Sequence, residues 1–146
     1  MDTQVDFSIY DQTGKLAAVA EAKKKPGITR TWATNWARNF LAHGGRRSPA
    51  YLLLATPEHV YLWKRPVESE VTEPTYTFDS KVLFQSYFSR PEVDPQQISP
   101  QAFELLVGSW LHDLMQKAWA TSDEPLAQSG FLDAVKHGHV ESDQRQ

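Results

Sequence analysis

The stretch LAAVAEAK, residues 16–23, decides the fold of this chain of 146 residues. Ahead of it, residues 5–9 alternate between apolar and polar side chains, which is the period-two pattern of a β-strand. The sequence DQTG at residues 11–14 has the composition of a tight turn, so residues 15–23 are predicted to return as the second strand of a hairpin. The small side chains of this second strand allow another element to pack closely over it.

Three charged residues stand on this predicted hairpin. Positions i and i+2 of a strand face the same side, so Glu21 and Lys23 project together, and Asp6 on the partner strand lies across from them if the register is right. Two carboxylates and a backbone carbonyl, such as that of Ala22, are oxygen ligands that suit Mg²⁺. A lysine beside the metal can orient an attacking water and offset charge in the transition state. The alternative is an ordinary strand face whose charges alternate in solvent.

The residues after the hairpin predict a helix and then a buried strand. Thr29 or Thr31 is suited to cap a helix that runs to about Ala42, with large aromatic side chains on its buried stripe. Continuous apolar sequence at residues 51–56 indicates a strand buried on both faces, and residues 59–63 indicate a further strand. A strand, a helix and a buried strand in succession imply a parallel crossover. We therefore expect a mixed sheet with at least one helix packed on it.

The C-terminal half is expected to be mainly helical. In order, the sequence predicts a strand or short helix at residues 76–88, a helix from Ser99 and Pro100 to about Trp119, a short helix at residues 131–137 and a frayed polar tail at residues 141–146. The expected organisation is one domain over residues 1–122, followed by a short helix and a polar tail over residues 123–146.

Composition excludes several classes of protein. The chain contains no cysteine, which excludes disulfides, zinc–thiolate sites and cysteine nucleophiles. No apolar run approaches the roughly 18–20 residues that a membrane helix needs. We therefore expect no membrane partner and a cytoplasmic location.

The net charge of −3 conceals a strong asymmetry along the chain. Residues 14–65 contain ten Lys and Arg residues and two acidic residues, whereas residues 66–146 contain five and thirteen. A basic segment on an acidic protein favours one face that attracts phosphate. The alternative is that the two halves pack together and neutralise each other.

These elements resemble those of the PD-(D/E)xK nuclease superfamily. Val5-Asp6, the turn at Gly14-Lys15 and the tripeptide at residues 21–23 resemble its Asp…Glu-x-Lys core. The stretch that follows this motif in restriction-endonuclease-like domains is similar to residues 32–43, 51–56 and 60–63. Within the superfamily, the chain resembles small stand-alone members and the nuclease domains of type I restriction subunits. The resemblance implies an α/β fold: a restriction-endonuclease-like mixed sheet flanked by helices, with a C-terminal helical segment.

The resemblance also implies a metal-dependent endonuclease that hydrolyses phosphodiester bonds in DNA with Mg²⁺, or with Mn²⁺. Asp6, Glu21 and the carbonyl of Ala22 would hold the metal, and Lys23 would be the catalytic lysine. Asn35 stands where some relatives carry a glutamine that helps to position the site. The implied setting is a homodimer or a larger defence or repair complex. Replacing Asp6 or Lys23 by alanine is expected to abolish cleavage and leave folding intact.

Two features depart from the superfamily pattern. Val5 stands in place of the proline, and only five residues precede Asp6, where relatives usually have a helix, often with another acidic residue, and a strand. This chain either lacks those elements, takes a substitute from its C-terminal half or from a partner, or starts later than its relatives. The alternative function is a catalytically inactive nucleic-acid-binding or assembly module on the same fold. A third is a protein-interaction subunit that docks through its acidic C-terminal half.

Four basic residues are predicted to contact nucleic acid: Lys24, Lys25, Arg30 and Arg38. Lys24 and Lys25 directly follow the Glu-x-Lys motif, and Arg38 lies one helical turn beyond Asn35. Phosphate contacts of this kind give salt-dependent affinity and little sequence preference. Each of the four is also explained by ordinary solvent exposure.

Overall fold

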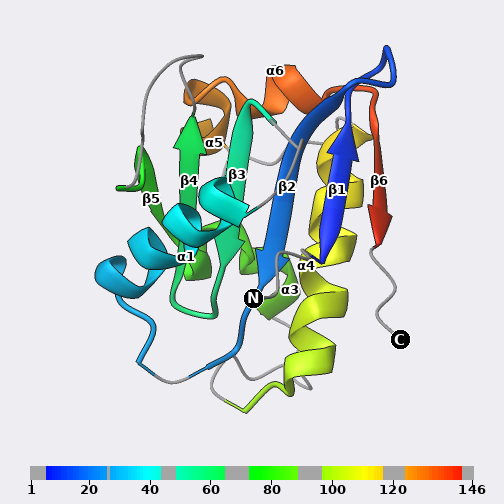
Figure 1. The fold of residues 1–146 in the computed structure, drawn as a ribbon. Coiled ribbons are helices and arrows are strands. Elements are labelled where there is room, and N and C mark those ends of the chain that lie inside the picture. The colour runs from blue at the N-terminus through cyan, green and yellow to red at the C-terminus, as the bar shows by residue number, and fades with distance from the viewer. Residues whose placement is uncertain are drawn as a thin grey trace.

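The computed structural model describes residues 6–25, 27–43, 49–64, 73–88, 97–116 and 124–142. They form an α/β fold, as predicted: a mixed sheet of parallel and antiparallel strands with helices on both faces (Figure 1). The strands are β1 (Phe7–Tyr10), β2 (Leu16–Ala22), β3 (Tyr51–Ala55), β4 (His59–Lys64), β5 (Tyr76–Asp79) and β6 (His139–Ser142). The helices are α1 (Arg30–His43), α2 (Ser80–Leu83), α3 (Gln85–Phe88), α4 (Pro100–Met115), α5 (Glu124–Gln128) and α6 (Phe131–Val135).

The predicted hairpin is confirmed as β1 and β2, which pair antiparallel. Its turn is closed by Asp11, whose Oδ1 accepts hydrogen bonds from the backbone N–H groups of Thr13 and Lys15 at 2.9 and 3.0 Å. Gly14 has a φ of 87°, a left-handed conformation that glycine adopts without strain. The hydrogen bond from the Thr13 side chain, together with the backbone bonds, holds the pKa of Asp11 below its ordinary value of 3.8.

The parallel crossover is also confirmed, because β3 pairs parallel to β2 while α1 connects the two. Thr29 is the capping residue: its Oγ1 accepts a hydrogen bond from the backbone N–H of Trp32 at 3.1 Å. The buried stripe of α1, which includes Ala33 and Ala37, packs against the side chains of Leu54 and Trp63 on the sheet. This packing places α1 on the face of the sheet that Val19, Leu52, Leu54 and Trp63 form.

The six strands lie in the order β5-β4-β3-β2-β1-β6, and two apolar cores lie on opposite faces of the sheet. One core is covered by α1, and the other is covered mainly by α4 (Figure 1). On the α4 side, Phe7 packs close to the helix: a Cβ added at Gly108 would lie 3.0 Å from the Phe7 ring. A small residue at this position of α4 therefore lets the helix approach β1.

The predicted polar tail is wrong for residues 141 and 142, since both belong to β6. This strand pairs antiparallel with β1, with Phe7 opposite Ser142 and Tyr10 opposite His139. The rings of Tyr10 and His139 stack with their centroids 5.0 Å apart. The ambiguous stretch at residues 76–88 contains both elements, a strand followed by two short helices. Helix α4 begins as predicted at Pro100, with Ser99 as its N-cap, but ends at Met115; Trp119 and residues 143–146 lie outside the described residues.

None of the described helices has the length and apolar character needed to cross a membrane. The segment after residue 123 contributes α5, α6 and β6, and β6 extends the same sheet as the N-terminal hairpin.

Candidate active site

The predicted acidic pair lies at one end of β1 and β2, in a single open pocket. In the antiparallel register Phe7 is opposite Ala20, so Asp6 and Glu21 stand one step further along the two neighbouring strands. Both side chains are largely buried, with 5% and 6% of each residue exposed. The pocket has a volume of about 410 Å³ and is lined by Asp6, Glu21, Ala22, Lys23, Lys24, Lys25, Pro100, Gln101 and Glu104.

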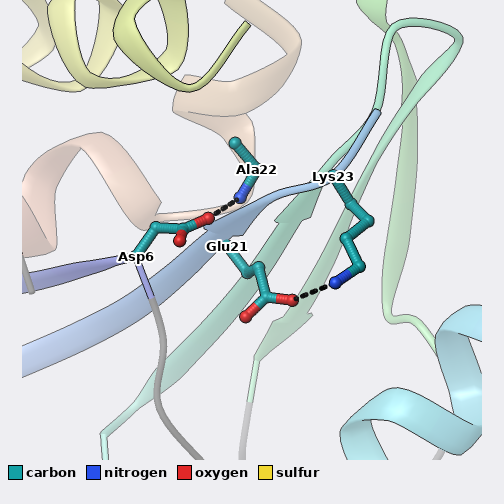
Figure 2. Close-up of polar contacts among 4 residues, drawn as sticks. All are labelled: Asp6, Glu21, Ala22 and Lys23. Carbon is teal, nitrogen blue, oxygen red and sulfur yellow. Dashed lines mark hydrogen bonds and ion pairs between the residues drawn. The ribbon is translucent and has the colours of Figure 1, made fainter. Parts of the chain in front are cut away.

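Asp6 is held by the backbone of the neighbouring strand. Its Oδ2 accepts a hydrogen bond from the N–H of Ala22 at 2.8 Å (Figure 2). The carboxylate oxygen therefore accepts the hydrogen bond that a backbone carbonyl would accept if β1 began one residue earlier. This bond fixes the direction of the carboxylate and satisfies a backbone donor that would otherwise lack a partner at the end of the ladder.

Glu21 and Lys23 project from the same face of the strand, as their spacing predicts. The Glu21 Oε2 and the Lys23 Nζ are 3.6 Å apart (Figure 2). The Glu21 side chain is 8% exposed and that of Lys23 is 39% exposed, so the ammonium group meets solvent while the carboxylate is enclosed. Burying a carboxylate carries a large desolvation cost, which a nearby positive charge offsets. The N–H of Lys23 also donates to the carbonyl of Ala55 at 2.8 Å, which extends the β2–β3 pairing.

The two carboxylates thus have separate partners: Asp6 is turned to the Ala22 backbone, and Glu21 is turned to Lys23 (Figure 2). Within the part of the chain that is described, no three His, Asp or Glu side chains are grouped closely enough to hold a metal ion. The donor chemistry of the pocket nevertheless suits a hard cation, because it offers two carboxylates and the carbonyl of Ala22 as oxygen ligands. The Mg²⁺ or Mn²⁺ site stays a prediction.

Sequence reasoning did not identify Glu104, which lies on the first turns of α4 and lines the same pocket. Its place in the pocket could not be predicted from local sequence patterns, because 80 or more residues separate Glu104 from the hairpin. The C-terminal half also supplies β6, the strand beside β1. A strand next to Asp6 and a helix that bears an acidic residue are therefore both present, and both come from the C-terminal half.

The residues predicted on α1 are not part of the pocket lining. Asn35 and Arg38 are both exposed, and the Asn35 Oδ1 accepts a hydrogen bond from Arg38 at 3.1 Å. Arg30 also stands apart, with its Nε 3.4 Å from a carboxylate oxygen of Glu73. Asn35 is therefore not among the residues that line the pocket, and its predicted positioning role stays a prediction.

In contrast to the residues predicted on α1, the two lysines after the Glu-x-Lys motif lie at the pocket. Lys24 and Lys25 both line the pocket, next to the acidic pair. The Nζ of Lys25 lies 5.4 Å from the centre of the Trp32 ring, a cation–π contact that holds the charge at the entrance to α1. The pocket lining thus includes three consecutive lysines and residues from the N-terminal end of α4.

Comparisons with protein-family models, with curated proteins and with solved structures each give no match to this chain. A function must therefore be argued from the chemistry of the pocket.

Proposed function

We propose that this pocket hydrolyses phosphodiester bonds in nucleic acid, with DNA as the preferred substrate, and that it does so with a bound Mg²⁺ ion. The observation that supports this most directly is the burial of two carboxylates beside one lysine in a single pocket. Buried charges are costly to stability, and they gather most often where chemistry needs them.

In this proposal Asp6, Glu21 and the carbonyl of Ala22 hold the ion. The bound metal would lower the pKa of a water molecule and reduce the charge on the phosphoryl oxygens. The hydrogen bond from the Ala22 N–H restricts the direction of the Asp6 carboxylate. Lys23 lies beside Glu21 and is accessible to solvent, so its ammonium group can contact a substrate phosphate and offset developing charge.

The lysines of the pocket indicate how the substrate approaches. Lys24 and Lys25 line the pocket beside Lys23, so three positive charges stand next to the buried carboxylates. A phosphate backbone would be attracted to these lysines. This attraction predicts an affinity for nucleic acid that falls as the salt concentration rises.

The test compares variants that remove charge and preserve shape: Glu21→Gln, Lys23→Met and Asp6→Asn. Cleavage of single-stranded and duplex DNA and RNA is measured with Mg²⁺ and with a chelator. We expect each variant to lose about 10²-fold or more of the Mg²⁺-dependent rate, as is usual when a charged catalytic group is removed. The matched control is Glu58→Gln, which neutralises an exposed carboxylate outside the pocket lining. Wild-type activity in all three variants would refute the proposal.

A second candidate is a nucleic-acid-binding module of the same fold that does not cleave. It is favoured by the separate partners of the two carboxylates, since each is stabilised without a metal. This candidate predicts salt-dependent binding that persists in chelator and in Asp6→Asn, with no cleavage of any substrate by the wild type. Metal-dependent cleavage by the wild type would exclude it.

A further inference from the structure

Strand β6 forms an outer edge of the sheet, next to β1 (Figure 1). Its inner side pairs with β1 over its full length, from His139 to Ser142. In an antiparallel ladder, alternate residues direct their N–H and C=O groups away from the paired strand. Among the described residues, no strand pairs with this outer side. An edge of this kind can accept another strand.

An open groove of about 350 Å³ lies beside this edge, between β6 and α4. Val140 and Ser142 line it from the strand, and Leu105 lines it from the helix. Leu105 is 74% exposed, the more exposed of the two large hydrophobic side chains that the described residues leave in solvent. Among the polar side chains that also line this groove, Leu105 and Val140 supply apolar area that pairing with another chain would remove from water.

The sequence of β6 suits pairing with itself. If two copies pair antiparallel about Val140, then His139 of each copy lies opposite Glu141 of the other, and the two Val140 side chains meet. His139 and Glu141 lie on the face opposite the groove. The His139 Nε2 is 3.3 Å from a Glu141 carboxylate oxygen, so the two side chains of one copy already point toward each other. Val140 lies on the groove face, where Leu105 of each copy adds apolar area. Side-chain hydrogen bonds and apolar pairs across strands are stabilising.

We propose that this chain forms a two-fold symmetric dimer in which β6 pairs antiparallel with β6 of a second copy, continuing the sheet across the interface. A second copy fits the edge better than an unrelated strand because the two-fold axis brings the His139–Glu141 pair and its reverse into register together. The proposal is independent of whether the pocket cleaves nucleic acid.

Sedimentation velocity over a range of concentrations, up to hundreds of micromolar, tests the dimer. We expect a dimer in the wild type. His139→Glu would place like charges opposite each other in both cross-strand pairs and weaken dimerisation by about tenfold or more. His139→Glu combined with Glu141→Lys places opposite charges in both pairs, and we expect it to restore the dimer. Leu105→Lys should weaken the dimer without unfolding the chain, because Leu105 is exposed.

The matched control is Lys81→Glu, a reversal of charge at an exposed position on α2, and it should leave the dimer unchanged. Circular dichroism spectra establish that each variant is folded. A wild type that is monomeric at every concentration would overturn the proposal. A dimer that tolerates His139→Glu, or one that the double variant fails to restore, would also overturn the antiparallel β6 pairing.

Discussion

The carboxylate of Asp6 accepts a hydrogen bond from the backbone N–H of Ala22 on the neighbouring strand, at 2.8 Å. Asp6 therefore has a structural role at the start of β1 in addition to its proposed metal-binding role. This changes the expectation that alanine at this position would affect cleavage alone, because Asp6→Ala also removes the partner of a backbone donor. The asparagine variant separates the two roles, since its amide oxygen can still accept the bond.

We predict that Asp6→Ala lowers the free energy of unfolding by about 1–3 kcal/mol, the usual cost of leaving a buried donor without a partner. Asp6→Asn should lower it by clearly less, because the bond to the Ala22 N–H is retained. Urea denaturation of both variants and the wild type measures the difference. Equal losses in the two variants would show that the hydrogen bond contributes nothing measurable.

The lysines of the pocket predict a salt effect on nucleic-acid binding. Replacing both Lys24 and Lys25 by glutamine should reduce the slope of log affinity against log salt by about 1 for each phosphate that the protein no longer neutralises. Fluorescence anisotropy with a labelled oligonucleotide, titrated at several salt concentrations, measures this slope. Lys81→Gln, which changes an exposed lysine outside the pocket, is the control and should leave the slope unchanged.

Tyr51 on β3 predicts a loss of stability in alkali. It is 5% exposed, its hydroxyl donates to the carbonyl of Ser129 at 3.3 Å, and burial raises its pKa above the ordinary value of 10.0. Because the folded state favours the neutral phenol, this contribution is fully present below pH 10 and is lost as the pH rises through the folded-state pKa. Tyr51→Phe should cost about 1 kcal/mol at neutral pH, because the hydrogen bond to Ser129 is removed.

The same variant should also lose stability less steeply with rising pH than the wild type does above pH 10. Some alkaline sensitivity will remain, since burial also raises the pKa of Tyr61. Denaturant titrations at neutral and alkaline pH measure both effects. A Tyr51→Phe variant with the full alkaline loss of the wild type would contradict the assignment to Tyr51.

Gly138 allows β6 to approach β1. A Cβ added there would overlap the carbonyl oxygen of Tyr10, which is a backbone atom that a side-chain rotation cannot move away. We predict that Gly138→Ala displaces β6 and costs about 3 kcal/mol. Gly14→Ala is the comparison: its Cβ would meet no atom within 4 Å, so it should cost only about 1–2 kcal/mol of left-handed backbone strain. Thermal and urea unfolding of the two variants rank these costs.

The hairpin and the crossover could be predicted because their signals are local. The alternation ahead of Asp11, the turn at Gly14 and the two-residue spacing of Glu21 and Lys23 each depend on neighbours in sequence. Strand β6 could not be predicted in this way. Its sequence, HVES, has one strongly apolar residue, and its pairing partner lies more than 120 residues earlier in the chain.

The sequence did not indicate the α4 side of the pocket, because that side depends on how the helix packs against the sheet. Glu104 lines the pocket because α4 packs across β1 at Gly108, which helical spacing alone does not reveal. Asn35 was expected near the carboxylates, yet its helix position is exposed and its amide is bonded to Arg38. Spacing in sequence therefore located the pocket residues of the hairpin, but it did not locate the pocket residue that α4 supplies.

The pairing of Phe7 with Ser142 has a consequence for chain order. Directly opposed residues in an antiparallel ladder are about 5 Å apart, so a short linker could join the two strands. If the circularised chain were opened ahead of α4, α4 and β6 would precede β1 in the new chain order. A helix and a strand would then come before Asp6, and β2, α1 and β3 would follow it. That is the order that the nuclease resemblance leads one to expect. A circular permutant of this design should rebuild the same pocket from a rearranged sequence.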